Sequence, residues 1–307
     1  MLSLQCVAAG IWSERGVMRY RIILQDAVES GAGMLGEGDA PVTVVIPCYR
    51  AAATLGRAVA SVAAQSWRPA EVIIVDDGSD DETPKVLEEL QGHYGTKWLK
   101  IVRLSANCGP GAARNVGWGM STQPYVAFLD ADDTWHPRKI EIQLGVMEAD
   151  PQLVLSGHGW RWLRTGIGTH DALPDTIQVS ILSPWRLLLS NSLSTPTVMV
   201  RRTIPFRFDP RKRYSEEYLL WLEIVLSGLR AAFINAKLAY LHKPPFGASG
   251  LSGNLWAMEV GELDTYYRLW RQGKIATATF LAVVCFSIGK FGRRMFQSAL
   301  WKMQTAK

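Results

Sequence analysis

The chain has 307 residues, of which 48% are hydrophobic and 20% are charged. This composition is typical of a globular protein with a sizeable core, and it excludes a disordered or fibrous chain. Lys and Arg outnumber Asp and Glu by five (33 against 28); this mild excess does not by itself indicate nucleic-acid binding, but it suits an anionic small molecule or a membrane surface.

The N-terminal residues 1–40 carry no convincing fold pattern. The chain begins with an apolar stretch, but no basic residue precedes it, so it does not resemble a secretion signal. Met34 lies just before the first clear strand. Residues 1–33 are therefore either an upstream read-through or a real, loosely ordered extension. The four cysteines show no metal-ligand spacing or disulfide-rich pattern, which favours a reducing cytosol.

From residue 42 to 130, predicted strands and helices alternate. Short β-branched runs predict the strands, and helical spacing of apolar residues predicts the helices. The strands are expected at 42–47, 71–76, 100–104 and 125–130, and the helices at 54–65, 83–90 and after the glycine-rich turn in 106–120. Because parallel strands need crossover connections, we predict an α/β fold with an open, mostly parallel twisted sheet and helices on both faces.

The pattern is looser after Pro137. We expect a helix at 138–149, a strand pair within 154–163, an apolar helix at 218–229 and two short strands within 231–245. The chain is predicted to be helical from Leu255 to its end. Residues 41–250 thus form the main domain, with halves 41–136 and 137–250, and residues 251–307 form a C-terminal helical tail.

The tail has two interpretations. Residues 275–288 are apolar, but the run is shorter than the ~20 residues that span a bilayer. Three basic residues then alternate with apolar ones: Lys290, Arg293 and Arg294. The segment is either a helix lying in an anionic membrane interface or a terminal helix packed on the domain with a basic face in solvent.

Polar residues follow three of the predicted strands. They are Pro47 to Tyr49, Asp76 to Ser79, and the acidic run Asp130, Asp132 and Asp133. Ligands of open α/β sheets bind at the carboxyl ends of the strands. Crowded carboxylates repel one another, so they hold a cation, share a proton or separate into water. The sequence therefore predicts one acidic rim.

Three segments together resemble the large inverting glycosyltransferase family 2, which has the GT-A fold. They are "VTVVIPCYRAAATLGRAVASVAAQSWRPAEVIIVDDGSDDET", "NCGPGAARNVGWGMSTQPYVAFLDADDTWHPRKIEIQL" and "YSEEYLLWLEIVLSG". The resemblance implies transfer of a sugar from a nucleotide-diphospho-sugar, often UDP-linked, to a hydroxyl of a glycan or lipid-linked saccharide. It also implies a Mn²⁺ or Mg²⁺ ion on the diphosphate and a role in cell-surface polysaccharide assembly.

The resemblance also implies roles for individual residues. Asp132 and Asp130 are the expected metal ligands, with Asp130 also at the ribose, and Asp133 either supports them or faces the acceptor. Asp77 is expected to accept a hydrogen bond from uracil. The remaining residues expected at the nucleotide-sugar are Pro47, Tyr49, Asp76, Gly109 and Arg114. Arg114 either offsets phosphate charge or holds the acidic rim together as an ion pair.

The expected catalytic base lies in "SEEY". The family usually has Glu-Asp there, and this chain has Glu216 and Glu217. We expect Glu217 to remove the acceptor proton, with Glu216 as the second candidate. His242 is interpreted as an ordinary loop histidine. A cytoplasmic location is expected, peripheral to the inner face of the plasma membrane if the tail binds there.

Two other functions stay open at this point. A nucleotidyltransferase can share this sheet and acidic site, although the segment after the first strand, "CYRAAATLG", lacks its glycine-rich basic stretch. A non-catalytic nucleotide-sugar-binding protein would retain the fold without turnover.

Overall fold

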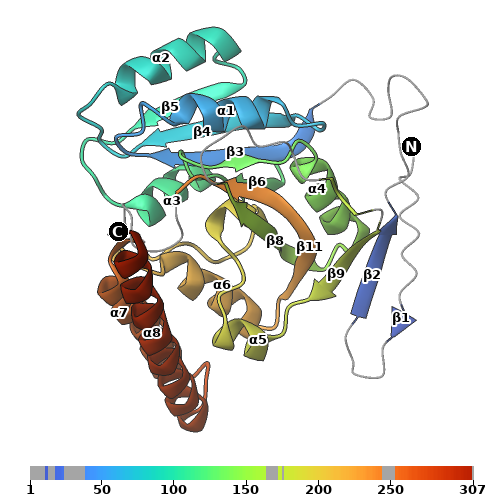
Figure 1. The fold of residues 1–307 in the computed structure, drawn as a ribbon. Coiled ribbons are helices and arrows are strands. Elements are labelled where there is room, and N and C mark those ends of the chain that lie inside the picture. Colours follow the sequence, from blue (N-terminus) through green and yellow to red (C-terminus); the bar gives the residue numbers. More distant parts are fainter. Residues whose placement is uncertain are drawn as a thin grey trace.

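The computed structural model describes residues 11–12, 18–23, 39–163, 172–174, 176–243 and 253–305. One sheet organises them, with the strand order β1-β2-β9-β11-β8-β10-β6-β3-β4-β5 and with β7 paired to β11. Figure 1 shows this sheet with helices packed around it. Its strands are β1 (Ile11–Trp12), β2 (Met18–Ile23), β3 (Ala40–Cys48), β4 (Pro69–Asp76), β5 (Leu99–Arg103), β6 (Tyr125–Phe128), β7 (Thr134–Trp135), β8 (Leu153–Trp162), β9 (Thr176–Ile181), β10 (Met199–Arg201) and β11 (Arg230–Leu241).

The first four strands of the main domain are parallel, as predicted. β3 pairs in parallel with β4 and β6, and β4 pairs in parallel with β5. The crossover helices are α1 (Leu55–Ala63), α2 (Thr83–Tyr94) and α3 (Pro110–Met120). Alternate side chains of each strand serve different faces: Val44 of β3 shares a core cluster with α1 and α2, whereas Val75 of β4 packs with Ala113 of α3.

The second half of the sheet is mixed. β8 and β11 are parallel to each other, whereas β9, β10 and β7 pair antiparallel to their neighbours. The predicted strand pair within 154–163 is wrong, because β8 is one continuous strand. Gly157 lies inside this strand and allows a close approach to its neighbour, since a Cβ atom on it would lie 2.3 Å from Leu193 Cδ2.

The two short strands expected within 231–245 are also one strand. β11 carries register shifts between Ile234 and Lys237 and between Lys237 and Ala239. These irregularities let a single strand pair with β9 near its start and with β7 near its end. Beyond Lys243, the predicted segment lies outside the described residues until Gly253.

Part of the N-terminal stretch belongs to the sheet. β2 pairs antiparallel with β9, and β1 pairs with β2. The expectation that residues 1–40 carry no fold pattern is therefore wrong for these strands. Met34 lies outside the described residues.

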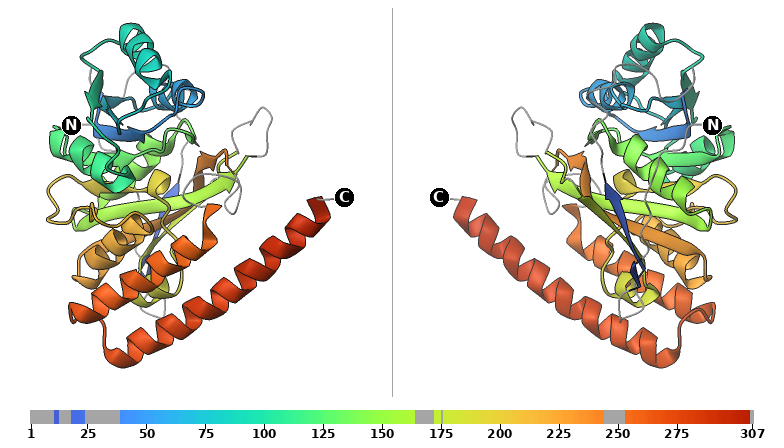
Figure 2. Two further views of the ribbon diagram at one scale, coloured as in Figure 1. Left: turned by 90° about the vertical axis from the view of Figure 1, so that its left-hand side faces the viewer. Right: turned by 90° about the vertical axis from the view of Figure 1, so that its right-hand side faces the viewer.

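Helices complete the second half of the chain and the predicted tail. They are α4 (Lys139–Ala149), α5 (Pro184–Leu189), the 3₁₀ helix η1 (Thr195–Thr197), α6 (Glu216–Leu226), α7 (Leu255–Arg271) and α8 (Thr277–Thr305). α7 and α8 form a hairpin at one end of the molecule, and Figure 2 shows α8 extending away from the sheet. Gly273, with φ +70°, lies between the two helices.

The C-terminal helices are packed onto the α/β body. Tyr266 and Leu269 of α7 and Val283 of α8 are buried in the same core cluster as Trp221 of α6. The packed-helix interpretation is therefore correct for this face of α8. In the described part of the chain, no helix has the length and apolar character needed to cross a bilayer.

Candidate active site

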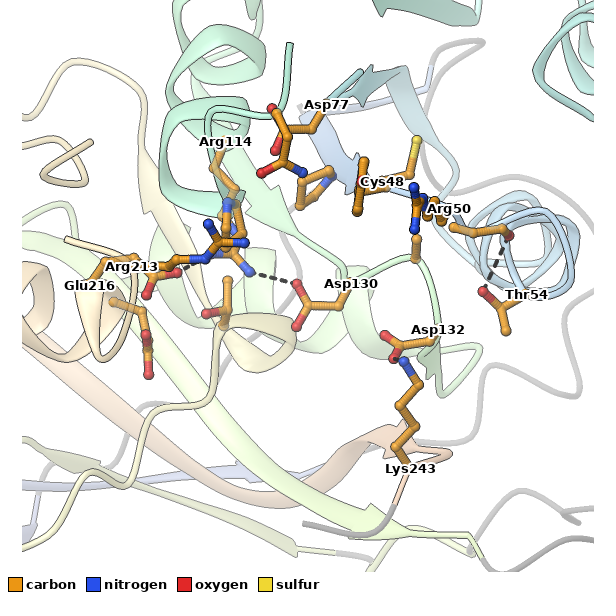
Figure 3. Close-up of a pocket in the computed structure, with 18 of the residues that line it drawn as sticks. Cys48, Arg50, Thr54, Asp77, Arg114, Asp130, Asp132, Arg213, Glu216 and Lys243 are labelled. Atoms are coloured by element: carbon orange, nitrogen blue, oxygen red, sulfur yellow. Dashed lines mark hydrogen bonds and ion pairs between the residues drawn. The ribbon is translucent and has the colours of Figure 1, made fainter. Parts of the chain in front are cut away.

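A cavity of about 500 Å³ opens at the carboxyl ends of β3 and β4, beside the loop after β6 and the first turn of α6. Figure 3 shows side chains from these elements around it. Eight of the ten predicted site residues line this cavity: Pro47, Tyr49, Asp77, Arg114, Asp130, Asp132, Glu216 and Glu217. Asp76 and Gly109 are not among its lining residues. Residues more than 150 positions apart thus meet where the parallel strands end.

Asp77 holds the glycine-rich turn in place. Its Oδ1 and Oδ2 accept hydrogen bonds from the backbone N–H groups of Cys108 and Gly109, both at 2.8 Å. Burial raises the pKa of Asp77, and these two donors partly offset that effect. Each carboxylate oxygen has a second lone pair, so Asp77 retains acceptor capacity toward the cavity.

Asp76 and Gly109 support the cavity from behind. Asp76 is buried, and its Oδ1 accepts a hydrogen bond from the backbone N–H of Ser79 at 3.0 Å. Gly109 has φ +92°, which favours glycine at the start of α3. Both residues thus shape the turns that carry Asp77 rather than contacting the cavity.

Arg114 joins two acids across the cavity. Its Nη2 lies 2.7 Å from Asp130 Oδ1 and its Nη1 lies 2.9 Å from Glu216 Oε1. The guanidinium is buried, and the nearby carboxylates raise its pKa despite the opposing effect of burial. Of the two roles predicted for Arg114, this geometry supports the ion pair that holds the acidic rim.

The two glutamates of α6 have different surroundings. Glu216 is paired with Arg114, whereas Glu217 makes no ion pair with any described residue. Burial raises the pKa of Glu217, and the negative charge of Glu216 raises it further. An unpaired carboxylate with a raised pKa, facing a cavity, has the properties of a general base.

Two residues of the cavity wall have a strained backbone, one of them directly before these glutamates. Ser215 has φ +55° and Arg50 has φ +48°, and they are the two non-glycine residues with positive φ among the described residues. Both line the cavity. Strain of this kind clusters at functional sites. Gly111 adds a close contact, since a Cβ atom there would lie 3.1 Å from Glu216 Cγ.

Asp132 forms an ion pair with a lysine side chain in this structure. The Nζ of Lys243 lies 2.8 Å from its Oδ2, as the dashed line in Figure 3 marks. Among the described residues no group of three His, Cys, Asp or Glu side chains could hold a metal alone. Mg²⁺ and similar ions commonly bind through one or two carboxylates together with substrate phosphates. Asp132 and Asp130 fit that kind of site, because both are oxygen donors on the cavity wall.

Asp133 lies behind the cavity wall. It is buried, and it accepts a hydrogen bond from the backbone N–H of His242 at 3.3 Å. Burial raises its pKa, and the charges of Asp130 and Asp132 add to this. The His242 ring lies 2.9 Å from Thr134 Oγ1. Asp133 is therefore placed to support the acidic loop rather than to face an acceptor.

Three cations of the cavity were missed by the sequence analysis. Arg50 forms an ion pair with Asp80 at 2.6 Å, and Arg213 and Lys243 line the cavity. Lys243 follows β11, which the resembling segments do not include. Arg213 lies two residues before Ser215, so its position next to "SEEY" was the signal that could have found it.

The comparisons with known proteins agree with this geometry. Residues 43–178 match the family model for Glycosyl transferase family 2. That range contains β4, β5, β6 and most of β3, together with Asp77, Arg114, and the acidic loop with Asp130 and Asp132. This segment of the chain therefore matches glycosyl transferase family 2.

Several curated relatives are glycosyltransferases or polysaccharide biosynthesis proteins. The chain is 28% identical over 201 residues to the UDP-Glc:alpha-D-GlcNAc-diphosphoundecaprenol beta-1,3-glucosyltransferase WfgD of Escherichia coli, covering 64% of this chain and 76% of WfgD. It is 37% identical over 131 residues to the succinoglycan biosynthesis protein ExoU of Rhizobium meliloti, covering 43% of this chain and 34% of ExoU. The chain is 43% identical over 100 residues to an uncharacterized glycosyltransferase of Nostoc sp., which covers 33% of this chain and 30% of that relative.

Solved structures confirm the predicted GT-A fold. TarS of S. aureus in complex with UDP-GlcNAc has a TM-score of 0.60 at 18% identity, covering 79% of this chain and 70% of that structure. The mannosyltransferase PcManGT of Pyrobaculum calidifontis, in complex with GDP-Man and Mn²⁺, has a TM-score of 0.61 at 15% identity, covering 86% of this chain and 76% of that structure.

Proposed function

We propose that this protein is a metal-dependent inverting glycosyltransferase. It moves a sugar from a nucleotide-diphospho-sugar, most simply a UDP-sugar, to a hydroxyl of a glycan or lipid-linked saccharide. The observation that carries the proposal is one cavity that contains both Asp132 of the acidic loop and the unpaired Glu217 of α6. Donor-binding and acceptor-activating groups therefore face the same space.

The donor is held by the β3, β4 and β6 side of the cavity. Asp77 retains acceptor capacity toward a base, and the cations Arg213 and Lys243 offset the charge of a diphosphate. Asp130 and Asp132 would hold a Mn²⁺ or Mg²⁺ ion, which supplies electrostatic stabilisation to the departing diphosphate when bound. Arg114 fixes the orientation of Asp130 through their 2.7 Å ion pair.

Glu217 is placed to activate the acceptor. Its carboxylate takes the proton of the attacking hydroxyl as the new bond forms to the anomeric carbon. The bond from that carbon to the phosphate oxygen breaks on the opposite side, and its electron pair leaves with the diphosphate. Direct displacement of this kind inverts the anomeric centre. Glu216 positions the first turn of α6 through Arg114.

The relatives support the substrate class. The name of WfgD specifies a UDP-glucose donor and an acceptor linked to a lipid diphosphate, and ExoU is named for succinoglycan biosynthesis. We propose that this chain likewise acts in cell-surface polysaccharide biosynthesis, in the cytoplasm at the inner face of the plasma membrane. TarS was solved with UDP-GlcNAc, and PcManGT with GDP-Man and Mn²⁺.

A screen of donors tests the proposal. The protein is incubated with Mn²⁺, with a UDP-, GDP- or dTDP-sugar, and with either a membrane extract or GlcNAc linked to a lipid diphosphate. The products are then identified by mass spectrometry. Release of nucleoside diphosphate together with a glycosylated acceptor supports sugar transfer. Release of pyrophosphate indicates a nucleotidyltransferase, and saturable binding without turnover indicates a binding protein; either result contradicts the proposal.

A further inference from the structure

The middle part of helix α8 turns three polar side chains toward α7. Ser287 Oγ donates to Glu259 Oε1 at 2.9 Å, and Lys290 Nζ lies 2.8 Å from Glu262 Oε1. Arg294 Nη2 lies 3.2 Å from Glu262 Oε2. Two of the basic residues that the sequence suggested for lipid contact are therefore paired between α7 and α8.

The opposite side of α8 is apolar and exposed. Leu281, Ile288 and Phe296 are 57%, 55% and 66% exposed. On α7, Trp256 is 65% exposed, and its ring lies 4.8 Å from the ring of Phe291 on α8. We define the outer face as these exposed apolar residues of the two helices: Trp256, Val260, Tyr267, Leu281, Phe286, Ile288, Met295 and Phe296.

This part of α8 departs from the usual pattern of a surface helix, whereas Val283, nearer the start of the helix, packs into the core. A helix of a soluble domain buries its apolar side and exposes its polar side. Here the polar groups satisfy one another inside the hairpin, and the apolar side chains meet solvent along several turns. Large exposed apolar patches mark interaction sites with proteins or membranes. The outer face therefore needs an apolar partner.

The positive charge of the C-terminal segment indicates which apolar partner the outer face binds. Residues 253–307 contain eight Lys and Arg and three Asp and Glu, an excess of five. The whole chain has 33 against 28, also an excess of five, so this segment carries the entire net positive charge. Arg271 and Arg293 are exposed on the same two helices as the outer face. A basic, apolar surface with Trp and Tyr suits anionic lipid head groups and the acyl chains below them.

We propose that the outer face of α7 and α8 docks the protein on an anionic bilayer surface. The helices lie in the interface without crossing it, because no described helix could span a bilayer. Met258, two residues after Trp256, lines the cavity. The docked molecule thus carries the cavity beside the membrane, where a lipid-linked acceptor is held. The docking itself is independent of the proposed sugar transfer, because no residue of the outer face lines the cavity.

Vesicle flotation of the full chain tests the apolar part of the proposal. The vesicles contain phosphatidylcholine with or without phosphatidylglycerol. We expect the protein to float with the anionic vesicles. The triple variant Phe286→Ser/Ile288→Ser/Phe296→Ser is expected to bind them with an affinity at least about tenfold lower. The matched control is Met120→Ser, which removes an exposed apolar side chain from α3. Equal flotation of the triple variant and the wild type would overturn the proposal.

Charge reversal tests the choice of partner. Arg293→Glu is expected to weaken binding to anionic vesicles, whereas Lys97→Glu, the same charge change at an exposed position after α2, is expected to leave it unchanged. Equal effects of the two substitutions would contradict docking through this face.

Failure of the wild type to float, together with a dimer in sedimentation that the triple variant dissociates, would assign the face to a second copy. Binding of UDP-sugar by each variant, measured in parallel, shows whether the cavity is intact and keeps a failure of docking distinct from a failure of the proposed function.

Discussion

Glu216 and Glu217 are adjacent in sequence but have different chemical roles in this account. Glu216 is held by Arg114, and Glu217 has a half-buried carboxylate with no charged partner among the described residues. The sequence predicted Glu217 as the base, with Glu216 as the second candidate, and the different surroundings of the two acids give a physical reason for the same choice. That choice remains a prediction, which substitution can test.

Glu217→Gln keeps the shape of the side chain and removes its ability to take a proton. We expect sugar transfer to fall by about 10²-fold or more, the scale of losing a general base. Calorimetry should show unchanged binding of the donor with Mn²⁺. Glu216→Gln is the matched control, since a glutamine can still accept a hydrogen bond from Arg114, and its loss of activity should be much smaller. A dead Glu216→Gln enzyme beside an active Glu217→Gln enzyme would transfer the base assignment to Glu216.

The pH dependence should report the raised pKa of Glu217. A base works only when deprotonated, and burial raises the pKa of Glu217 from 4.5 to about 8. The value of kcat/KM should therefore rise with pH through that region and fall as the pH drops below it. Because the charge of Glu216 contributes to the shift, Glu216→Gln should move this limb to lower pH. If kcat/KM of Glu216→Gln rises at the same pH as that of the wild type, Glu217 is not the titrating group.

At the scale of elements, the close approach of α3 to β3 sets the position of Arg114. Gly117 makes this approach feasible, since a Cβ atom on it would lie 2.4 Å from Val45 Cγ1. Gly117→Ala should lower the free energy of unfolding by about 1–3 kcal/mol through overpacking. In the same helix, a Cβ atom added to Gly119 would meet nothing within 4 Å outside the adjacent helix backbone, and Gly119→Ala should be neutral or stabilising by up to about 1 kcal/mol. Urea denaturation compares the two, and equal effects would contradict this packing.

The elements that could be predicted are those whose residues follow one simple period. The β-branched runs of β3 and β4 and the helical spacing of α1 were sufficient to predict the parallel half of the sheet and the rim where the cavity lies. β8 and β11 were divided wrongly, because glycine at Gly157 serves a tertiary contact and because the register shifts of β11 have no local signal.

The site residues that lie in contiguous motifs could be predicted from the sequence. Which of two adjacent residues faces the cavity depends on side-chain direction and was harder to predict. Asp76 and Asp77 are adjacent, and successive residues at the end of a strand point in opposite directions. Only Asp77 therefore reaches the cavity, which the sequence could not distinguish. Lys243 could not be found at all, because its contact with Asp132 depends on β11 ending beside the acidic loop.

At the scale of the whole molecule, the C-terminal hairpin has two distinct sides. One side shares the core around Trp221 through Val283, and the other is the outer face. Deleting residues from 275 onward would remove both together, so solubility after deletion cannot separate docking from folding. Single substitutions on each side can.

Val283→Ala should destabilise the protein by about 1–3 kcal/mol, because it removes buried methyl groups and leaves a cavity. Leu281→Ala, two residues earlier on the exposed side, should change the free energy of unfolding by less than about 0.5 kcal/mol. Thermal unfolding in detergent-free buffer measures both. A larger loss for Leu281→Ala than for Val283→Ala would mean that the helix presents its other side to the core.

We propose that the acidic rim at the strand ends binds a nucleotide-sugar through a divalent cation. Calorimetric titration of a UDP-sugar into the full chain tests it most directly, with Mn²⁺ or with EDTA, on the wild type and on Asp132→Asn. Asp132 lies on the cavity wall and contributes nothing to the apolar core, so the variant should fold normally. The account predicts saturable binding of the wild type with Mn²⁺, and loss of that binding both in EDTA and in Asp132→Asn. Equally strong binding under all these conditions would contradict it.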